Sequence, residues 1–295
     1  MPGQKAFTTI NRVGIIAKHN IAKYKELVFE ILDLLEAEGK TVYLDEFTAE
    51  LKGVKKSYTR PQILKQAELV LVFGGDGTLL TVARSLPKSV VHVLGINTGT
   101  LGFLTELEGE RAISGLKRVL SGNYVVDKRI LLRVTMYKDG QKVATHLALN
   151  DAVITHGAKS RLIHLPVEIN QRQVNRYQAD GLIIATPTGS TGHSLSAGGP
   201  IVHPKLEAFV VTPICPLSIS NRPIILPSDR QIKITLDTFR DQHESVSLTI
   251  DGQICTPVEY QSEIKIRRSS RKLYLIRLTG ENYYRKLRGK LSWGS

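Results

Sequence analysis

The turn at residues 74–78 (GGDGT) combines the residue types best suited to chemistry in this sequence. It follows an apolar run at residues 69–73 and precedes a helix-like run at residues 79–83. Glycines let the backbone approach a ligand closely, and N–H groups at the start of a helix can hold phosphate. A carboxylate beside phosphate is repelled unless it takes a proton from a reacting hydroxyl or shares a divalent cation with the phosphate. The turn therefore predicts phosphoryl transfer; the structural alternative is that Asp76 only caps the helix. The candidate phosphate-binding residues are Gly74, Gly75, Gly77 and Thr78.

A second stretch, residues 180–200, runs from the apolar sequence Leu-Ile-Ile into a dense series of hydroxyls and glycines. So many small polar residues would weaken a core, but they suit a wall that donates hydrogen bonds to ribose and amide groups at close range. A flexible Gly/Ser linker is the alternative interpretation. The preceding apolar run and the Thr-Pro-Thr sequence disfavour it.

Composition limits the class of protein. With 295 residues, 42% of them hydrophobic and 23% charged, the chain predicts a soluble globular protein of one large domain or two ordinary ones. We find no apolar stretch near the roughly 18 residues of a membrane helix and no apolar signal-peptide core. Two cysteines, Cys215 and Cys255, are too few for a disulfide framework. We therefore expect a cytoplasmic protein that does not bind membranes.

The net charge of +13 predicts anionic partners. Basic residues are not interleaved with aromatic ones, so a solvated basic face is favoured over a nucleic-acid groove. The motifs GxxxxGK[ST], GxGxxG, HExxH and GxSxG are absent, and the eight histidines lack metal-ligand spacing. We expect no nucleic-acid partner and no protein-bound metal site.

The first third of the chain alternates strands and helices. This pattern predicts a doubly wound, mostly parallel sheet with the glycine turn and a second glycine loop, residues 97–104, at its ligand-binding edge. A polar loop is expected over residues 45–60. Expected strands are residues 13–17, 41–44, 69–73 and 90–96; expected helices are 24–35, 61–67 and 112–120.

Short strand patterns dominate after residue 125 and predict a largely antiparallel, sandwich-like β domain. The pair Asp139-Gly140 predicts a hairpin. We expect an α/β domain over residues 1–124, joined by the C-terminal segment 271–295, and a β-rich domain over residues 125–270. Expected strands are residues 130–137, 142–149, 152–155, 165–169, 182–185, 209–214, 231–236, 246–250 and 264–266.

The motif series resembles that of bacterial NAD kinases in order and spacing. It comprises GGDGT at 74–78, GINTGTLGFL at 95–104, Asn150-Asp151, and DGLIIATPTGSTGHSLSAGGP at 180–200. GGDG alone also occurs in diacylglycerol-type lipid kinases and phosphofructokinases, whereas the combination is specific and extends over nearly the whole chain. The resemblance implies an α/β N-terminal domain, a β-rich C-terminal domain, NAD bound between them, and a homo-oligomer, dimer or tetramer.

By position, the resemblance makes Asp76 the proton acceptor that activates the 2′-hydroxyl of the adenosine ribose. The residues that it implies in dinucleotide binding are Asp76, Gly77, Phe103, Asn150, Asp151, Arg161, Gln178, Asp180, Thr188, Thr191, Gly192, His193, Ser196 and Gln253. Several have simpler interpretations: the Asn150-Asp151 pair as a turn, Phe103 as core, and Arg161 and Gln253 as surface groups.

Three positions depart from the family's usual pattern. Gly192-His193 replaces Ala-Tyr, so that stacking on an imidazole can survive while a phenol contact cannot. Gln178 stands where many members have a basic residue. Asp151 stands where Glu is frequent and reaches one methylene less.

The implied activity is transfer of the terminal phosphoryl of ATP or polyphosphate, carried with Mg²⁺, to NAD. Two alternatives stay open at this stage. One is a lipid or sugar kinase that shares the GGDG turn. The other is a non-catalytic regulator that binds a dinucleotide.

Overall fold

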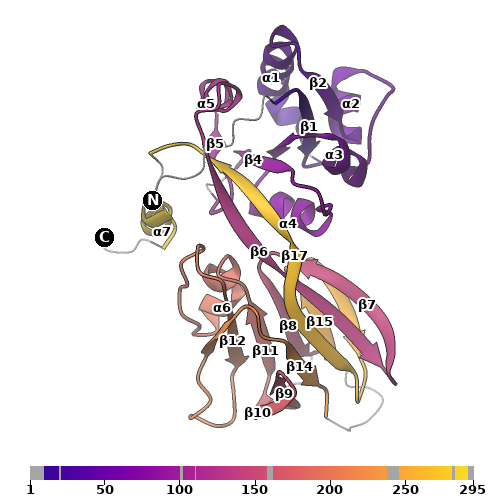
Figure 1. Cartoon of the computed structure of the whole chain (residues 1–295), viewed down its shortest axis with the longest axis vertical. Helices are drawn as coiled ribbons and strands as arrows, with labels where there is room; N and C mark the ends of the chain where they lie inside the picture. Colours follow the sequence, from indigo (N-terminus) through magenta and orange to yellow (C-terminus); the bar gives the residue numbers. More distant parts are fainter. Residues whose placement is uncertain are drawn as a thin grey trace. The chain divides into compact units, whose positions relative to one another are not determined.

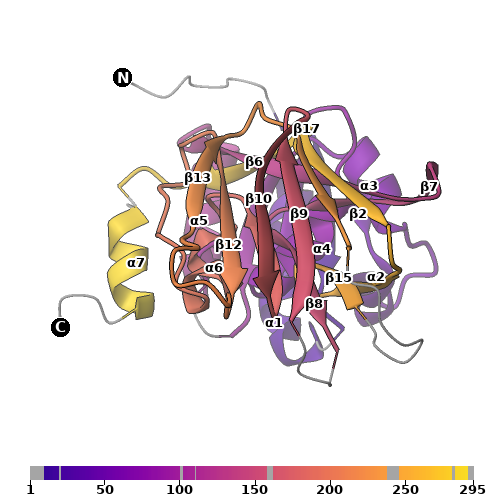
Figure 2. The same cartoon turned by 90° about the horizontal axis from the view of Figure 1, so that it is seen from below.

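The structure is a computed structural model that describes residues 10–19, 21–99, 102–109, 111–157, 162–237, 246–280 and 283–291. The chain divides into two compact units. Unit 1 comprises residues 1–128 and 273–295, and unit 2 comprises residues 129–272. Figures 1 and 2 show the elements of each unit in sequence colours. No helix in the described part of the chain combines the length and apolar composition needed to cross a membrane.

Unit 1 contains a parallel sheet. Its strands are β1 (Arg12–Ala17), β2 (Thr41–Leu44), β3 (Leu69–Phe73), β4 (His92–Asn97) and the short β5 (Leu107–Glu108). β1 lies between β2 and β3, and β4 pairs with both β3 and β5, always in parallel. The last residues of β17 (Glu263–Arg277) also pair with β4 in parallel, with Tyr274 opposite His92. The predicted parallel sheet is confirmed.

Helices cover both faces of this sheet. Val13 and Ile15 of β1 pack in one apolar cluster with Val28 and Ile31, whereas Gly14 between them faces the other side. A Cβ on Gly14 would lie 2.2 Å from Cγ2 of Ile63, which belongs to the helix at Arg60–Gln66. Glycine therefore lets this helix approach the strand. The doubly wound prediction is therefore confirmed. The helices of unit 1 are η1 (Ile21–Tyr24), α1 (Lys25–Ala37), α2 (Glu46–Lys52), α3 (Arg60–Gln66), α4 (Asp76–Arg84), α5 (Arg111–Leu120) and α7 (Tyr283–Leu291).

The expected loop at residues 45–60 was wrong, because α2 occupies its first half. Asp45 caps this helix by accepting the N–H of Thr48 at 2.9 Å, and Gly53 ends it in the left-handed conformation at φ 75°. The helix has seven residues and little apolar periodicity, so only its capping residues indicate a helix in the sequence.

Unit 2 is built from antiparallel strands in two sheets. One sheet has the order β13-β12-β11-β8-β15-β16. The other strands of the unit pair as β10-β9-β14-β17 and as the hairpin of β6 with β7. The antiparallel prediction and the Asp139-Gly140 hairpin are confirmed, since both turn residues have positive φ. The strand bounds are β6 (Val125–Lys138), β7 (Gln141–Ala148), β8 (Asp151–His156), β9 (Ile163–Ile169), β10 (Arg172–Ala179), β11 (Gly181–Ala185), β12 (Ala208–Ile214), β13 (Ile224–Pro227), β14 (Ile232–Thr235), β15 (Val246–Ile250) and β16 (Ile254–Val258).

Three strands of unit 2 were not expected from the sequence: β10, β13 and β16. β10 has the sequence RQVNRYQA, which contains only two large apolar residues. Its pairing with β9 along nearly its whole length, rather than its own residue pattern, makes it a strand.

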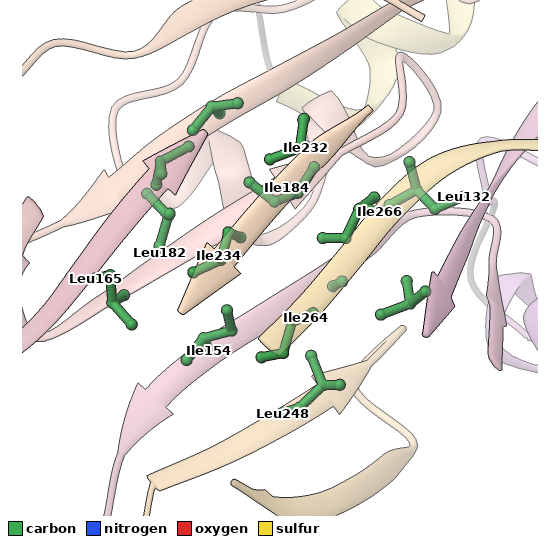
Figure 3. Packing of buried hydrophobic residues seen from close by; sticks show 14 of the residues in the cluster. Leu132, Ile154, Leu165, Leu182, Ile184, Ile232, Ile234, Leu248, Ile264 and Ile266 are labelled. Atoms are coloured by element: carbon green, nitrogen blue, oxygen red, sulfur yellow. The ribbon is translucent and has the colours of Figure 1, made fainter. Parts of the chain in front are cut away.

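The core of unit 2 lies between its two sheets (Figure 3). Leu182 and Ile184 of β11 point into this core, whereas Ile183 between them packs in a separate cluster on the opposite face. This period of two is expected for a strand that is buried on both faces. The sandwich-like prediction is therefore confirmed.

We predict that Ile184→Ala lowers the free energy of unfolding by about 2–5 kcal/mol, because the Ile184 side chain is fully buried and its removal leaves a cavity. Ile225→Ala on β13 is the matched control, since Ile225 is 53% exposed, and should change stability by less than about 0.5 kcal/mol. Chemical denaturation of both variants measures the difference. Equal losses would contradict the assignment of Ile184 to the core.

Candidate active site

The glycine turn lies between β3 and the start of α4. Gly75 occupies the N-cap position, and Asp76 is the first residue of the helix. No side chain caps the helix, so the interpretation of Asp76 as a simple helix cap is wrong. A Cβ on Gly74 would lie 2.2 Å from Thr78 Oγ1, which explains the need for glycine there. The N–H groups of Thr78 and Leu79 donate to the Gly75 carbonyl at 3.1 Å and 3.4 Å, and the positive end of the helix dipole lies at this turn.

The Asp76 carboxylate is bound to the second glycine loop. Its Oδ2 accepts the Phe103 N–H at 2.8 Å, and its Oδ1 accepts the Leu104 N–H at 3.0 Å. A Cβ on Gly102 would lie 2.0 Å from Asp76 Oδ1, so glycine is required for this approach. The loop thus orients a half-buried carboxylate at a helix N-terminus, and the predicted proximity of the two glycine loops is confirmed.

The same loop extends from the end of β4. Asn97, the last residue of that strand, is 3% exposed and donates to the Gly99 carbonyl at 2.8 Å. Tyr24 donates its hydroxyl to the Thr98 carbonyl. Side-chain hydrogen bonds therefore fix the entry to the loop as well as its exit.

In unit 2, part of the predicted set of residues lines one cavity. Asn150, Asp151 and His193 lie there together. The cavity volume of about 380 Å³ is within the range of small-molecule sites. The remaining lining residues are Val153, Thr155, Thr249, Asp251 and Gly252.

Asp251 organises the cavity and was missed by the sequence interpretation. Its Oδ2 accepts the Leu149 N–H at 3.0 Å, and its Oδ1 accepts the N–H groups of Asn150 at 2.8 Å and Asp151 at 3.1 Å. Asp251 has φ 50° and is followed by Gly252 at φ 64° in the turn between β15 and β16. The Asp-Gly pair was a readable hairpin signal, but its partner about 100 residues away was not.

Electrostatics set Asp151 apart from an ordinary surface carboxyl. Burial, followed by the nearby charge of Asp251, raises the pKa of Asp151 from 3.8 to about 7. The side chain therefore carries a proton part of the time near neutral pH. It can donate or accept a hydrogen bond there.

The hydroxyl-rich stretch folds into two short helices, η2 (Gly189–Thr191) and α6 (His193–Ser196), so the linker interpretation is wrong. A Cβ on Gly189 would lie 2.2 Å from the Asn150 carbonyl oxygen, and the Thr186 N–H donates to that oxygen at 2.8 Å. This stretch therefore packs directly on the Asn150 turn. Thr188 accepts a hydrogen bond from the buried Arg129 at 3.0 Å.

Other predicted residues do not line the cavity. Asp180 lies after β10, with its Oδ1 3.4 Å from His156 Nε2. Gln178 is on β10, and Gln253 is in the β15–β16 turn, where its N–H donates to the Ile250 carbonyl. Thr188, Thr191, Gly192 and Ser196 belong to η2, α6 and the residues next to them. Arg161 lies outside the described residues.

No group of three His, Cys, Asp or Glu side chains in the described ranges is placed to hold a metal ion. Mg²⁺ is commonly bound by substrate phosphates with one or two protein carboxylates.

Two family models match most of the chain. The ATP-NAD kinase N-terminal domain matches residues 13–124, and the ATP-NAD kinase C-terminal domain matches residues 149–278. The chain is 42% identical to the NAD kinase of Geotalea daltonii and 38% identical to that of Geobacter sulfurreducens. Each alignment covers 97% of this chain and 99% of the relative.

Two solved structures are similar over nearly the whole chain. Yeast NADH kinase complexed with NADH is 28% identical with a TM-score of 0.88, over 98% of this chain and 89% of that one. An NAD kinase from Archaeoglobus fulgidus in complex with ATP is 25% identical with a TM-score of 0.70, over 95% and 98% of the two chains.

We predict that Asp151→Asn makes stability less dependent on pH. Because the folded-state pKa of Asp151 lies above its ordinary value, its protonated form favours folding below pH 3.8, and that contribution is lost as the pH rises through about 7. The variant should therefore exceed the parent chain in stability at pH 8 by roughly 2–4 kcal/mol and match it near pH 4.

Denaturation between pH 4 and 8 measures this difference. Asp139→Asn is the control, because the Asp139 side chain is 80% exposed in a hairpin turn. A parallel pH dependence for Asp151→Asn and the parent chain would contradict the raised pKa.

Proposed function

This chain belongs to the NAD kinase family, and we propose from that premise which of its residues carry out the reaction. The enzyme transfers the terminal phosphoryl group of ATP to the 2′-hydroxyl of the adenosine ribose of NAD, giving NADP. The match of both domain models over residues 13–124 and 149–278 opposes the lipid-kinase and sugar-kinase alternatives. Membership in a kinase family likewise opposes a non-catalytic regulator.

Asp76 is the proposed proton acceptor. One observation carries the proposal: among the residues that the structure describes, each carboxylate oxygen accepts one backbone N–H, from Phe103 and Leu104. A carboxylate has about four acceptor positions, so both oxygens can accept another hydrogen bond while their orientation is fixed. Asp76 takes the 2′-hydroxyl proton as the ribose oxygen bonds to phosphorus and the bond from phosphorus to the bridging oxygen of ADP breaks.

The start of α4 is the proposed phosphate site. Gly75, Gly77 and Thr78 lie around Asp76 at the start of this helix, and the helix dipole favours the phosphoryl charge at this end. Gly77 is exposed, so a phosphate could approach its backbone. Mg²⁺ bound to the donor nucleotide would neutralise phosphate charge near Asp76.

Unit 2 contributes the proposed NAD contacts around its cavity. Asn150 and Asp151 can hydrogen-bond to ribose hydroxyls, since the Asp251 carboxylate fixes their backbone. His193 is exposed at the start of α6 and lines the same cavity, where its ring can stack on a base or nicotinamide. Further contacts with the dinucleotide are proposed from position in the family motif alone. The residues concerned are Phe103, Arg161, Gln178, Asp180, Thr188, Thr191, Gly192, Ser196 and Gln253.

A homo-oligomer and a cytoplasmic location complete the proposal, on the basis of the family. Cys215 and Cys255 are both exposed and unpaired, which suits a reducing compartment. Light scattering of the purified chain measures the subunit number.

We predict that Asp76→Asn lowers kcat roughly 10²- to 10⁴-fold, because an amide cannot take the ribose proton. NADP formed from NAD and MgATP is measured with an NADP-specific dehydrogenase, and circular dichroism checks the fold. Asp229→Asn is the control, since the Asp229 side chain is 65% exposed. Near-normal turnover of Asp76→Asn would remove Asp76 from the chemistry.

We also predict that His193→Ala raises the KM for NAD by roughly 2- to 10-fold and leaves kcat nearly unchanged, because ring stacking stabilises the ground state and the transition state alike. His193→Phe keeps a flat ring and should retain the parent KM. Steady-state kinetics with NAD as the varied substrate separate the two variants. An equal rise of KM in both variants would show that the ring nitrogens of His193, and not stacking on its face, contribute to NAD binding.

A further inference from the structure

The Arg277 side chain binds carbonyl groups of the loop whose N–H groups bind Asp76, and Lys286 Nζ also donates to the Thr105 carbonyl at 2.6 Å. Arg277, the last residue of β17, donates through Nη2 to the Phe103 carbonyl at 3.0 Å. Its Nη1 donates to the carbonyls of Leu104 at 3.0 Å and Thr105 at 3.2 Å. Phe103 and Leu104 therefore each donate an N–H to Asp76 and accept a hydrogen bond from Arg277.

Arg277 is itself held in place. Its Nη1 lies 2.8 Å from Glu106 Oε2, and its Nε lies 3.3 Å from Asp127 Oδ2. The Arg277 side chain is 11% exposed, and that of Glu106 is fully buried. Lys286 of α7 reaches the same Glu106 oxygen at 2.8 Å, while the other oxygen accepts the Leu278 N–H at 2.9 Å. The guanidinium position is thus set from several directions.

The charges of the buried cluster formed by Glu106, Arg277 and Lys286 stabilise one another. Burial alone would raise the pKa of Glu106, but the charges of Arg277 and Lys286, with hydrogen bonds from Lys286 and Leu278, together lower it below its ordinary value of 4.5. Glu106 therefore stays ionised at neutral pH and keeps both cations against the loop. The fork of the guanidinium matches a curved row of carbonyl oxygens, which the single ammonium of lysine cannot.

The effect on Asp76 follows from the direction of the peptide dipoles. A cation that binds the carbonyl of a residue favours the orientation in which the loop carbonyls face it. The Phe103 carbonyl and the Leu104 N–H belong to one peptide, so the bond from Arg277 Nη2 to that carbonyl presents the Leu104 N–H to Asp76 Oδ1, 3.0 Å away. The Phe103 N–H, 2.8 Å from Asp76 Oδ2, belongs to the preceding peptide of the same loop. Cooperative hydrogen-bond chains of this kind also strengthen each member.

We propose that Arg277 is a positioning residue for phosphoryl transfer, because it acts through the peptide between Phe103 and Leu104 to fix the orientation of the Asp76 carboxylate. Arg277 does not touch the reacting atoms in this proposal. The inference rests on the proposed role of Asp76 as proton acceptor. It assigns to the C-terminal segment a part in the reaction that no motif in the N-terminal two thirds of the sequence reveals.

The first test is Arg277→Lys, which keeps the charge and removes the fork. We expect kcat to fall roughly 10- to 100-fold, because a carboxylate displaced by about 1 Å is a poor proton acceptor. The KM values for NAD and ATP should stay within about twofold. Arg277→Gln is the second variant; Glu106 keeps Lys286 as its partner there, so no buried charge is left unpaired. It should lose at least as much kcat as Arg277→Lys.

Arg118→Lys and Arg118→Gln are the matched controls. Arg118 of α5 donates to Thr279 Oγ1 at 2.8 Å and to the Thr279 carbonyl at 3.4 Å, two residues beyond Arg277 and outside the loop at residues 97–104. Both control variants should keep the parent kcat. Unchanged kcat in Arg277→Lys, or a loss expressed in KM alone, would overturn the inference.

A double-mutant cycle with Asp76→Asn separates positioning from general structural support. If Arg277 acts only through the Asp76 carboxylate, Arg277→Lys should change the residual kcat of Asp76→Asn by less than about twofold. Multiplicative losses would overturn the inference and leave the role of Asp76 intact. Near-normal kcat in Asp76→Asn alone would instead overturn the proposed function on which the inference rests.

Discussion

The candidate active site of unit 1 depends on two hydrogen bonds between the Asp76 carboxylate and the consecutive N–H groups of Phe103 and Leu104. A carboxylate on a helix N-terminus can rotate unless both oxygens are held, and here each oxygen has its own donor. Charge-assisted bonds of this type are among the strongest in proteins. These two hydrogen bonds require glycine at position 102, because any side chain there would collide with Asp76 Oδ1.

Unit 2 uses the same interaction for a different purpose. Asp251 accepts the N–H groups of three consecutive residues, Leu149, Asn150 and Asp151, and so fixes the turn that opens the cavity. Asp251 is 6% exposed, and its charge adds to the effect of burial in raising the pKa of the neighbouring Asp151. Asp76, by contrast, is only half-buried. One buried acid therefore fixes the turn beside the cavity, whereas the half-buried acid is the one that we propose as the proton acceptor.

Local patterns predicted most of the fold. The apolar run of β3, the helical spacing of α1 and the Asp-Gly turn between β6 and β7 each correspond to an element with nearly the expected bounds. α2 and β10 were missed because neither is apolar enough to show its period. The first is specified by its caps and the second by pairing with β9.

The sequence by itself determined the fold class, the kinase family and the turn that carries Asp76, because glycine turns and buried strands are encoded by neighbouring residues. Only the tertiary structure decided what holds that acid and what surrounds Asp151. Arg277 lies 174 residues from the Phe103 carbonyl that it binds, and Asp251 lies 100 residues from Asp151. Interactions over such separations leave no local pattern, since they arise only when β-sheet pairing brings distant strand ends together.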